Sequence, residues 1–311
     1  AALQELETAV ESGGGGGSTQ VATISDLSSL SPSDNDRIYV EGYYSQFDGG
    51  QGYFVYDANL VLSTTNANSG SIIDPASMTT WDGTQSDIND LITEQTGSTN
   101  TGAWVREEYY ESGIFTSGQV GIVNDTTIAQ DIAFDNAIAF LQPSQSLDLK
   151  YLVRIDNDKK ILKEQTALMS SNRQGGIYMA VYWTPDGKIR PESYSTIDGC
   201  RFIISRLAAY GQTSVLPMVI QLQSDDEHVT IKNCLFDIDG ERGEGQYREF
   251  NNQHIRLVGD NHIIENCEFY DSKAGIYTNG SSLWTVKGCY FTRCDDGIKI
   301  AIGDNFSYTV T

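Results

Sequence analysis

The 311-residue sequence lacks long apolar runs, clustered basic residues and paired cysteine motifs. No stretch approaches the roughly 18–20 consecutive apolar residues that span a bilayer, and no basic leader with an apolar centre opens the chain. We therefore predict no membrane insertion. Lys and Arg total 20 against 42 Asp and Glu, which gives a formal net charge of −22. Because a phosphate-binding surface needs clustered cations, we predict no nucleic-acid partner.

The five cysteines fit neither a disulfide framework nor a zinc site, because their number is odd and none lies in a CxxC pair. The three histidines form no recognisable ligand set. Two acidic runs, 156–158 and 225–227, lack the spaced ligands of a dedicated calcium loop. We predict no bound metal and no cofactor.

The first twenty residues divide into a short amphipathic segment and a glycine run. Leu3, Leu6 and Val10 recur at helical spacing, which predicts a helix over 1–12. Such a helix is marginal alone, so it fits either a coiled coil with sister chains or a frayed terminus. Five successive glycines make 13–20 a flexible linker.

Residues 21–112 are rich in short β-prone segments and turn residues, and we assign them to a small β-rich domain. Strands are predicted at Arg37–Val40, Tyr53–Tyr56 and Trp104–Arg106. Trp81, Trp104 and the tyrosines of this region could form a sugar-stacking surface, but aromatic residues of strands are more often part of the core, where we place them.

The segment 125–141 carries the clearest helical pattern, with Asp125 or Thr126 as the expected cap. Its predicted apolar stripe comprises Ile128, Ile132, Ala133, Asn136, Ala137, Phe140 and Leu141. A single strand is expected next, over 147–155.

A repeat dominates the remaining sequence. Four segments share an aliphatic residue, two small or polar residues ending in Gly or Asn, a cysteine, a variable residue and a phenylalanine: Ile197–Phe202, Ile231–Phe236, Ile264–Phe269 and Val286–Phe291. Self-similarity at this interval without a helical period indicates a solenoid. The predicted fold class is therefore all-β, with the repeat forming a parallel β-helix over 113–311.

The repeat also predicts which side chains point inward. Cysteines of successive coils should stack as a buried ladder of thiols, and the preceding Gly or Asn should supply a left-handed turn. Gly275-Ile276 and Gly297-Ile298 mark the next strand of the same coil. The sequence distances from Cys200 to Cys234 and from Cys234 to Cys267 are longer than that from Cys267 to Cys289. The longer distances imply loops inserted into those coils.

The sequence stops at Thr311, directly after a strand-like run. An open solenoid end presents unpaired backbone groups, which natural proteins cover. We therefore expect further coils and a trimerising C-terminus beyond this residue.

Three stretches resemble bacteriophage tailspikes of the pectate-lyase-like, right-handed parallel β-helix class. Residues 37–57 with 102–106 look like the small domain that precedes many such β-helices, and the segment that begins at Asp125 looks like the helix that caps the first coil. The Cys/Phe coils look like the body of the solenoid. Such tailspikes are usually homotrimers on a virion, and many bind or cleave host surface polysaccharide, which the resemblance implies here.

Hydrolysis of a polysaccharide needs two carboxyl groups, one protonated and one ionised. Asp295 and Asp296, followed by Gly297, are similar to part of the polygalacturonase pattern, in which such a pair is catalytic. The same residues also suit a solvated turn.

The second candidate is the loop 237–250, because inserted loops on rigid scaffolds concentrate binding residues. We assign Glu241 and Glu244 as candidate catalytic acids. The substrate-binding candidates of this loop are Arg242, Tyr247, Arg248 and Glu249. An exposed charged loop, or salt bridges to a neighbouring subunit, are the alternatives.

Trp183 is a further substrate-binding candidate, because an exposed indole can stack on a sugar, although a hairpin turn explains the same stretch. We hypothesise a homotrimeric receptor-binding subunit that attaches to tail or baseplate proteins of a virion through its N-terminus and faces host surface glycan. A polysaccharide depolymerase, either hydrolase or lyase, is one alternative. A passive structural baseplate or adhesin component is another.

Overall fold

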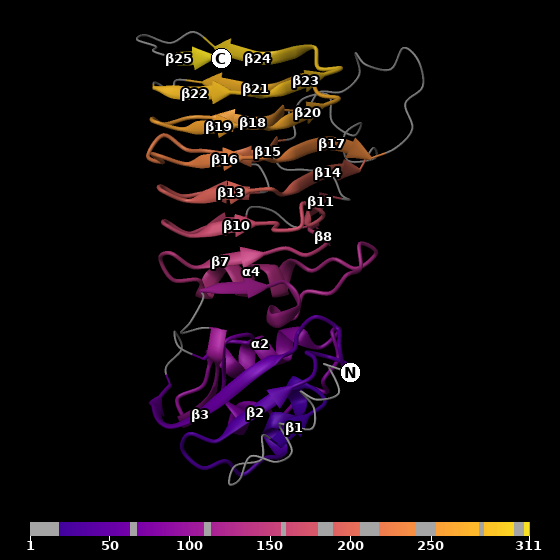
Figure 1. The fold of residues 1–311 in the computed structure, drawn as a ribbon, viewed down its shortest axis with the longest axis vertical. Helices are drawn as coiled ribbons and strands as arrows, with labels where there is room; N and C mark the ends of the chain where they lie inside the picture. Colours follow the sequence, from indigo (N-terminus) through magenta and orange to yellow (C-terminus); the bar gives the residue numbers. More distant parts are fainter. Residues whose placement is uncertain are drawn as a thin grey trace, which may run out of the picture.

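The computed structural model describes residues 19–62, 67–108, 113–156, 160–179, 189–205, 218–239, 253–279, 283–301 and 308–310. A small sheet domain lies at one end of an elongated molecule, and stacked coils of β-strand make up the rest (Figure 1). The predicted helix over 1–12 lies outside the described residues. Of the predicted linker, Thr19 and Gln20 are described, and they belong to the first strand.

The small domain is built on a sheet whose described strands follow the order β1-β2-β3-β5-β4. The strands are β1 (Thr19–Val21), β2 (Arg37–Val40), β3 (Gly52–Val61), β4 (Ile72–Ile73) and β5 (Thr101–Arg106). The first two pair in parallel and the others are antiparallel. The helices η1 (Ile24–Ser29), η2 (Pro75–Ser77) and α2 (Ile88–Thr96) accompany them.

The predicted strands of this domain are confirmed, and its tryptophans lie in the core, whereas Tyr53 is 36% exposed. Trp104 is 2% exposed and Trp81 is 8% exposed, so neither indole forms a sugar-stacking surface. Burial of these large side chains is the main stabilising contribution available to so small a domain.

A buried arginine joins the small domain to the solenoid. Arg106 is fully buried, and its guanidinium donates to the carbonyl oxygens of Gly70 at 3.1 Å, Gly50 at 3.3 Å and Gln119 at 3.5 Å. Burial lowers its pKa to about 10. Because Gln119 lies in η3 (Gly118–Val120), at the start of the solenoid, the cation fixes the two parts together.

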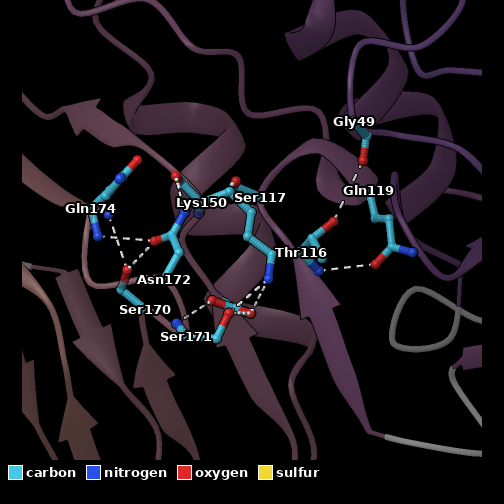
Figure 2. A network of polar contacts seen from close by, with 11 residues as sticks. Gly49, Thr116, Ser117, Gln119, Lys150, Ser170, Ser171, Asn172 and Gln174 are labelled. Atoms are coloured by element: carbon cyan, nitrogen blue, oxygen red, sulfur yellow. Dashed lines mark hydrogen bonds and ion pairs between the residues drawn. The ribbon is translucent and has the colours of Figure 1, made fainter.

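The glycines that precede the solenoid are required by close packing. A Cβ atom on Gly118 would lie 2.4 Å from the carbonyl carbon of Gly49, and Gly121 adopts a left-handed φ of 78°. Thr116 donates from Oγ1 to the Gly49 carbonyl at 3.5 Å and from its amide to Gln119 Oε1 at 2.9 Å (Figure 2).

The helix predicted over 125–141 is present but shorter, as α4 (Asp131–Phe140). Asp125 does not cap it, because its carboxylate accepts hydrogen bonds from the amide and hydroxyl of Thr127 in a local turn that competes with helix. Ile128 and Ile132, which we predicted in the apolar stripe, are 42% and 47% exposed.

The buried face of α4 consists of Ala133, Phe134, Ala137 and Ile138. Its acidic residues Asp131 and Asp135 lie 3.0 and 2.8 Å from the buried Nζ of Lys160, which belongs to the first coil. The helix therefore covers the solenoid end nearest the small domain (Figure 1).

Three parallel sheets form the described solenoid, and each of the six coils from β7 to β24 contributes one strand to each sheet, with β6 and β25 extending the first sheet at its two ends. The first sheet comprises β6 (Ile114–Thr116), β7 (Ser146–Asp148), β10 (Ala167–Met169), β13 (Thr196–Asp198), β16 (Thr230–Lys232), β19 (Ile263–Glu265), β22 (Trp284–Lys287) and β25 (Tyr308–Val310). The second comprises β8 (Leu152–Arg154), β11 (Gly176–Met179), β14 (Arg201–Ser205), β17 (Leu235–Asp239), β20 (Glu268–Tyr270) and β23 (Tyr290–Thr292). The third comprises β9 (Lys160–Leu162), β12 (Ile189–Pro191), β15 (Met218–Gln221), β18 (Gln253–Leu257), β21 (Ala274–Asn279) and β24 (Asp296–Ala301).

The ladders predicted from the repeat are confirmed. The four phenylalanines are register partners, and consecutive rings stack with centroids 4.9 Å apart. The first three repeat cysteines are buried, the fourth is partly buried, and all five cysteines are free thiols. The residue before each repeat cysteine has a positive φ: Gly199 (70°), Asn233 (56°), Asn266 (52°) and Gly288 (62°).

The single strand predicted over 147–155 is instead two strands, β7 and β8, joined by a bend. Polar contacts hold this corner (Figure 2). The Asp148 carboxylate accepts from the Ser171 amide at 2.9 Å and from Lys150 Nζ at 2.5 Å. Asn172, on the next coil, donates to the Lys150 carbonyl at 2.9 Å. The sequence did not indicate this bend, because the residues on both sides of it are apolar and read as one continuous strand.

Candidate functional site

Seven predicted site residues lie outside the described residues: Trp183, Glu241, Arg242, Glu244, Tyr247, Arg248 and Glu249. Six of them fall between the end of β17 at Asp239 and the start of β18 at Gln253. Their assignments remain predictions.

The predicted catalytic pair lies at the start of β24. Asp295 is exposed, and Asp296 is partly exposed with Oδ2 3.7 Å from Lys299 Nζ. Their amides donate to the carbonyls of Ser272 and Lys273 on the preceding coil, both at 2.9 Å. This geometry fits the solvated-turn alternative, and a catalytic role for the pair remains a prediction.

A cluster of acidic and aromatic side chains lies on the outer face of the second sheet. In these strands the residues flanking each core phenylalanine point outward, because side chains alternate along a strand. Phe236 and Phe269 are register partners, which places Asp237 beside Tyr270. We define the carboxylate–tyrosine cluster as Tyr178, Asp237, Asp239, Glu268 and Tyr270.

The carboxyl group of Asp237 is more than half-buried within this cluster. Burial raises the pKa of its carboxyl group above the usual range. The Ile238 amide, which donates at 2.8 Å, and the guanidiniums of Arg293 and Arg201 oppose that effect, whereas the Asp239 carboxylate adds to it. Asp237 thus retains its proton to higher pH than an ordinary aspartate.

The two tyrosines are each held by a carboxylate. Tyr178 donates its hydroxyl to Asp239 Oδ2 at 3.3 Å. Tyr270 donates to Glu268 Oε2 at 2.7 Å, and this hydrogen bond is the main reason that its pKa rises to about 12. The Arg293 guanidinium lies 5.8 Å from the Tyr270 ring. Both rings are only partly buried.

Asp237 and Asp239 are alternate residues of one strand, which places their side chains on one face roughly 6.5–7 Å apart. Inverting glycosidases hold their acid and base about 6.5–9.5 Å apart. The cluster can therefore supply two carboxyl groups at the spacing of such an acid and base, together with two partly exposed tyrosine rings.

Sequence reasoning placed Asp237 and Asp239 in an inserted loop, but they belong to β17. It missed Tyr178, Glu268 and Tyr270 altogether. The signal was present in the repeat, because the variable residue before each phenylalanine and the residue after it are the outward positions of the second sheet.

A cavity of about 750 Å³ lies where α4 meets the third sheet. Its polar lining includes Asp135, Lys163, Glu164 and Glu192, and its apolar lining includes Ile161. Burial raises the pKa of the Asp135 carboxyl group. The Lys163 ammonium donates to the Ala139 carbonyl, so acidic groups dominate the cavity.

In the part of the chain that the structure describes, no helix could span a membrane, and no group of three or more acidic, cysteine or histidine side chains could hold a metal ion. His254 and His262 are buried, with ring nitrogens 2.8 and 2.9 Å from the carbonyl oxygens of Tyr270 and Val258. Both imidazoles therefore have structural roles.

Two family models match the chain. Residues 20–109 match the phage tail protein small four-stranded β-sheet domain, and residues 219–307 match the right-handed β-helix region. The second match agrees with the handedness that we predicted for the solenoid. No curated protein matches the sequence.

Several solved structures share this fold. A tailspike protein from the Acinetobacter baumannii bacteriophage Fri1, described as a capsular polysaccharide depolymerase, has a TM-score of 0.59 at 16% identity, covering 94% of this chain and 52% of that protein. The enzymatically active domain of tailspike protein 2 from bacteriophage CBA120 has a TM-score of 0.55 at 12% identity, covering 93% and 43%. This chain thus spans about half the length of those structures.

Proposed function

We propose that this chain, which joins a phage tail β-sheet domain to the parallel β-helix fold of phage tailspikes, is a virion-attached receptor-binding subunit. Its ligand is polysaccharide on the host cell surface. The small domain lies at the attached end, and the solenoid points toward the host.

Attachment through the N-terminus and assembly as a homotrimer belong to the same proposal. The predicted helix over 1–12 and the glycine run that follows suit a short coiled coil joined flexibly to the small domain. Mass photometry of the full-length gene product tests the assembly. Trimers are the expected species, and monomers alone would contradict it.

The carboxylate–tyrosine cluster is the observation that supports glycan binding. Carboxylates accept hydrogen bonds from sugar hydroxyls, and tyrosine rings cover the apolar faces of sugars while keeping a polar tip in water. The cluster lies on β-strands, which hold its side chains more rigidly than a loop does. It also lies next to the inserted segment that begins after Asp239.

Adsorption of labelled full-length protein to encapsulated bacteria, each strain paired with its acapsular mutant, tests this binding. We expect adsorption only to encapsulated cells of the host strain. Tyr270→Ala should weaken it about tenfold, which corresponds to roughly 1.4 kcal/mol. Tyr194→Ala is the matched control, because Tyr194 is 52% exposed and stacks on His228 between the third and first sheets. Equal adsorption by the two variants would contradict the assignment.

A depolymerase is the second candidate function, and the raised pKa of Asp237 beside Asp239 is the observation that favours it. A protonated Asp237 can serve as general acid while Asp239 activates water. Asp237→Asn should abolish the release of reducing ends from capsular polysaccharide while adsorption persists. The same assay on Asp295→Asn and Asp296→Asn tests the pair predicted from sequence. Activity that survives in Asp237→Asn and disappears in Asp296→Asn would move the catalytic site to β24.

A further inference from the structure

The outer face of the third sheet carries one column of side chains in register along the solenoid axis. Inward-facing isoleucines occupy the alternate positions: Ile189, Ile220, Ile255, Ile276 and Ile298 are consecutive partners. The residue after each isoleucine therefore points outward. These residues form what we name the third-face ladder: Arg190, Gln221, Arg256, Tyr277 and Lys299.

Cations occupy every second coil of this ladder. Arg190, Arg256 and Lys299 alternate with Gln221 and Tyr277, so neighbouring positive charges are about 10 Å apart, twice the spacing between paired strands. Cationic side chains are scarce in this chain, which has 20 basic and 42 acidic residues. Three of them share one column on one face.

Two inner positions of the ladder each have a buried side-chain atom without a hydrogen-bond partner in the part of the chain that the structure describes. Arg256 Nε and Gln221 Oε1 are buried without a hydrogen bond. Among the described residues, no acid lies within ion-pair distance of Arg256. Arg190 Nε is also buried without a hydrogen bond, and the nearest carboxylates, of Asp225 and Asp226, are 3.7 and 3.9 Å from its guanidinium. Arg190 therefore already faces two carboxylates. A half-buried guanidinium such as that of Arg256, with no ion pair among the described residues, is costly unless an anion pairs with it.

We propose that the third-face ladder binds an acidic polysaccharide that lies along the solenoid axis and carries a carboxylate on alternate sugars. Arg190, Arg256 and Lys299 pair with successive carboxylates, and Arg256 supplies the central contact. Tyr277, between two cations, offers a ring to the intervening sugar. This inference rests on the proposed function and assigns the carboxylated sugars of its ligand to the third sheet, away from the carboxylate–tyrosine cluster of the second sheet.

Two neighbouring features limit the site. The acidic cavity beside α4 lies next to Ile161, the register partner of Arg190, and repels an anionic chain there. The bound segment therefore extends from Arg190 toward Lys299. At the other end, Asp296 lies 3.7 Å from Lys299 and weakens that contact, which leaves Arg256 as the strongest position.

Fluorescence anisotropy with labelled hyaluronan oligosaccharides, which carry one carboxylate per disaccharide, tests the ladder on the full chain. Polygalacturonate, with a carboxylate on every sugar, and neutral dextran are the comparison polymers. We expect hyaluronan to bind most tightly, dextran not to bind, and affinity to fall with added salt. Arg256→Gln should weaken binding about tenfold or more, the effect of losing a charge-assisted hydrogen bond.

Lys287→Gln is the matched control, because it removes one cation from the first sheet, where Lys287 pairs with Glu265 at 3.1 Å. Arg256→Lys keeps the charge without the planar guanidinium and should bind with intermediate affinity. Absence of hyaluronan binding, or equal loss in Arg256→Gln and Lys287→Gln, would overturn the inference. Arg256→Gln is compared with wild type by circular dichroism, so that unfolding is not read as lost binding.

Adsorption to cells separates this inference from the proposed function. If wild-type protein adsorbs to encapsulated cells but Arg256→Gln adsorbs equally and hyaluronan is not bound, the ladder assignment fails and the proposed function stands. If wild-type protein does not adsorb to any encapsulated strain, the proposed function fails, whatever the ladder binds.

Discussion

Replacing Phe236 with alanine tests the stacked core of the solenoid. Its ring is completely buried and lies 4.9 Å from the rings of both Phe202 and Phe269, with interplanar angles of 13° and 6°. A Phe→Ala change in a packed core costs about 3–5 kcal/mol. Because two ring contacts are lost with the side chain, each worth about 0.5–1.5 kcal/mol, we expect a loss of roughly 4–5 kcal/mol in the free energy of unfolding.

Urea denaturation followed by circular dichroism measures this loss, and native-state hydrogen exchange shows whether it is confined to the coils around Phe236. Phe47→Ala is the matched control, because Phe47 is 71% exposed, and its loss should stay within about 0.5 kcal/mol. Similar losses in the two variants, or a loss below about 1 kcal/mol in Phe236→Ala, would refute the stacked arrangement.

Two further predictions concern buried polar groups. Burial lowers the pKa of His254 to about 4 from its ordinary 6.5. Because the unfolded chain then binds the proton more tightly than the folded one, the free energy of unfolding is at its full value above pH 6.5. It falls as the pH is lowered toward 4. At about 1.4 kcal/mol per pH unit, the loss of unfolding free energy reaches roughly 3 kcal/mol. Urea midpoints measured across this pH range should show a smaller loss in His254→Gln than in wild type, and an unchanged loss in His228→Gln, whose ring is exposed. Equal acid sensitivity of the two variants would contradict this. Arg106→Met leaves buried carbonyls unpaired and should cost about 3 kcal/mol or more, whereas Arg37→Met, which breaks an exposed ion pair with Glu107, should cost about 1 kcal/mol or less. Thermal melts that rank them in the opposite order would refute the role of Arg106 in joining the two parts.

The solenoid could be predicted because its repeat constrains the structure at every coil. A shift of one residue would turn the aliphatic, cysteine and phenylalanine positions outward together, so the sequence permits only one register. The Gly or Asn before each cysteine fixes the turn in the same way, since few other residues adopt a positive φ without strain.

The start of α4 and the residues of the candidate site were harder to predict from the sequence than the solenoid was. Asp125 and Thr127 form a local turn whose hydrogen bonds resemble those of a helix cap, and the exposed Ile128 and Ile132 extend the apolar pattern beyond the helix. The cluster around Asp237 depends on register between strands of different coils. Its residues are separated in sequence by the inserted loops. The pairing of Phe236 with Phe269 brings Tyr270 beside Asp237, and the pairing of β11, β14 and β17 brings in Tyr178.

Hydroxyl-radical footprinting with mass spectrometry, in the presence and absence of the capsular polysaccharide to which the protein adsorbs, tests the central claim most directly. Oxidation of Tyr178 and Tyr270 should fall when polysaccharide is bound, because both rings belong to the carboxylate–tyrosine cluster, while Tyr194, on another corner of the solenoid, should be oxidised as before. Protection of Tyr277 would show in the same experiment whether the third sheet is also covered. Unchanged oxidation of Tyr178 and Tyr270 with saturating polysaccharide would contradict the account.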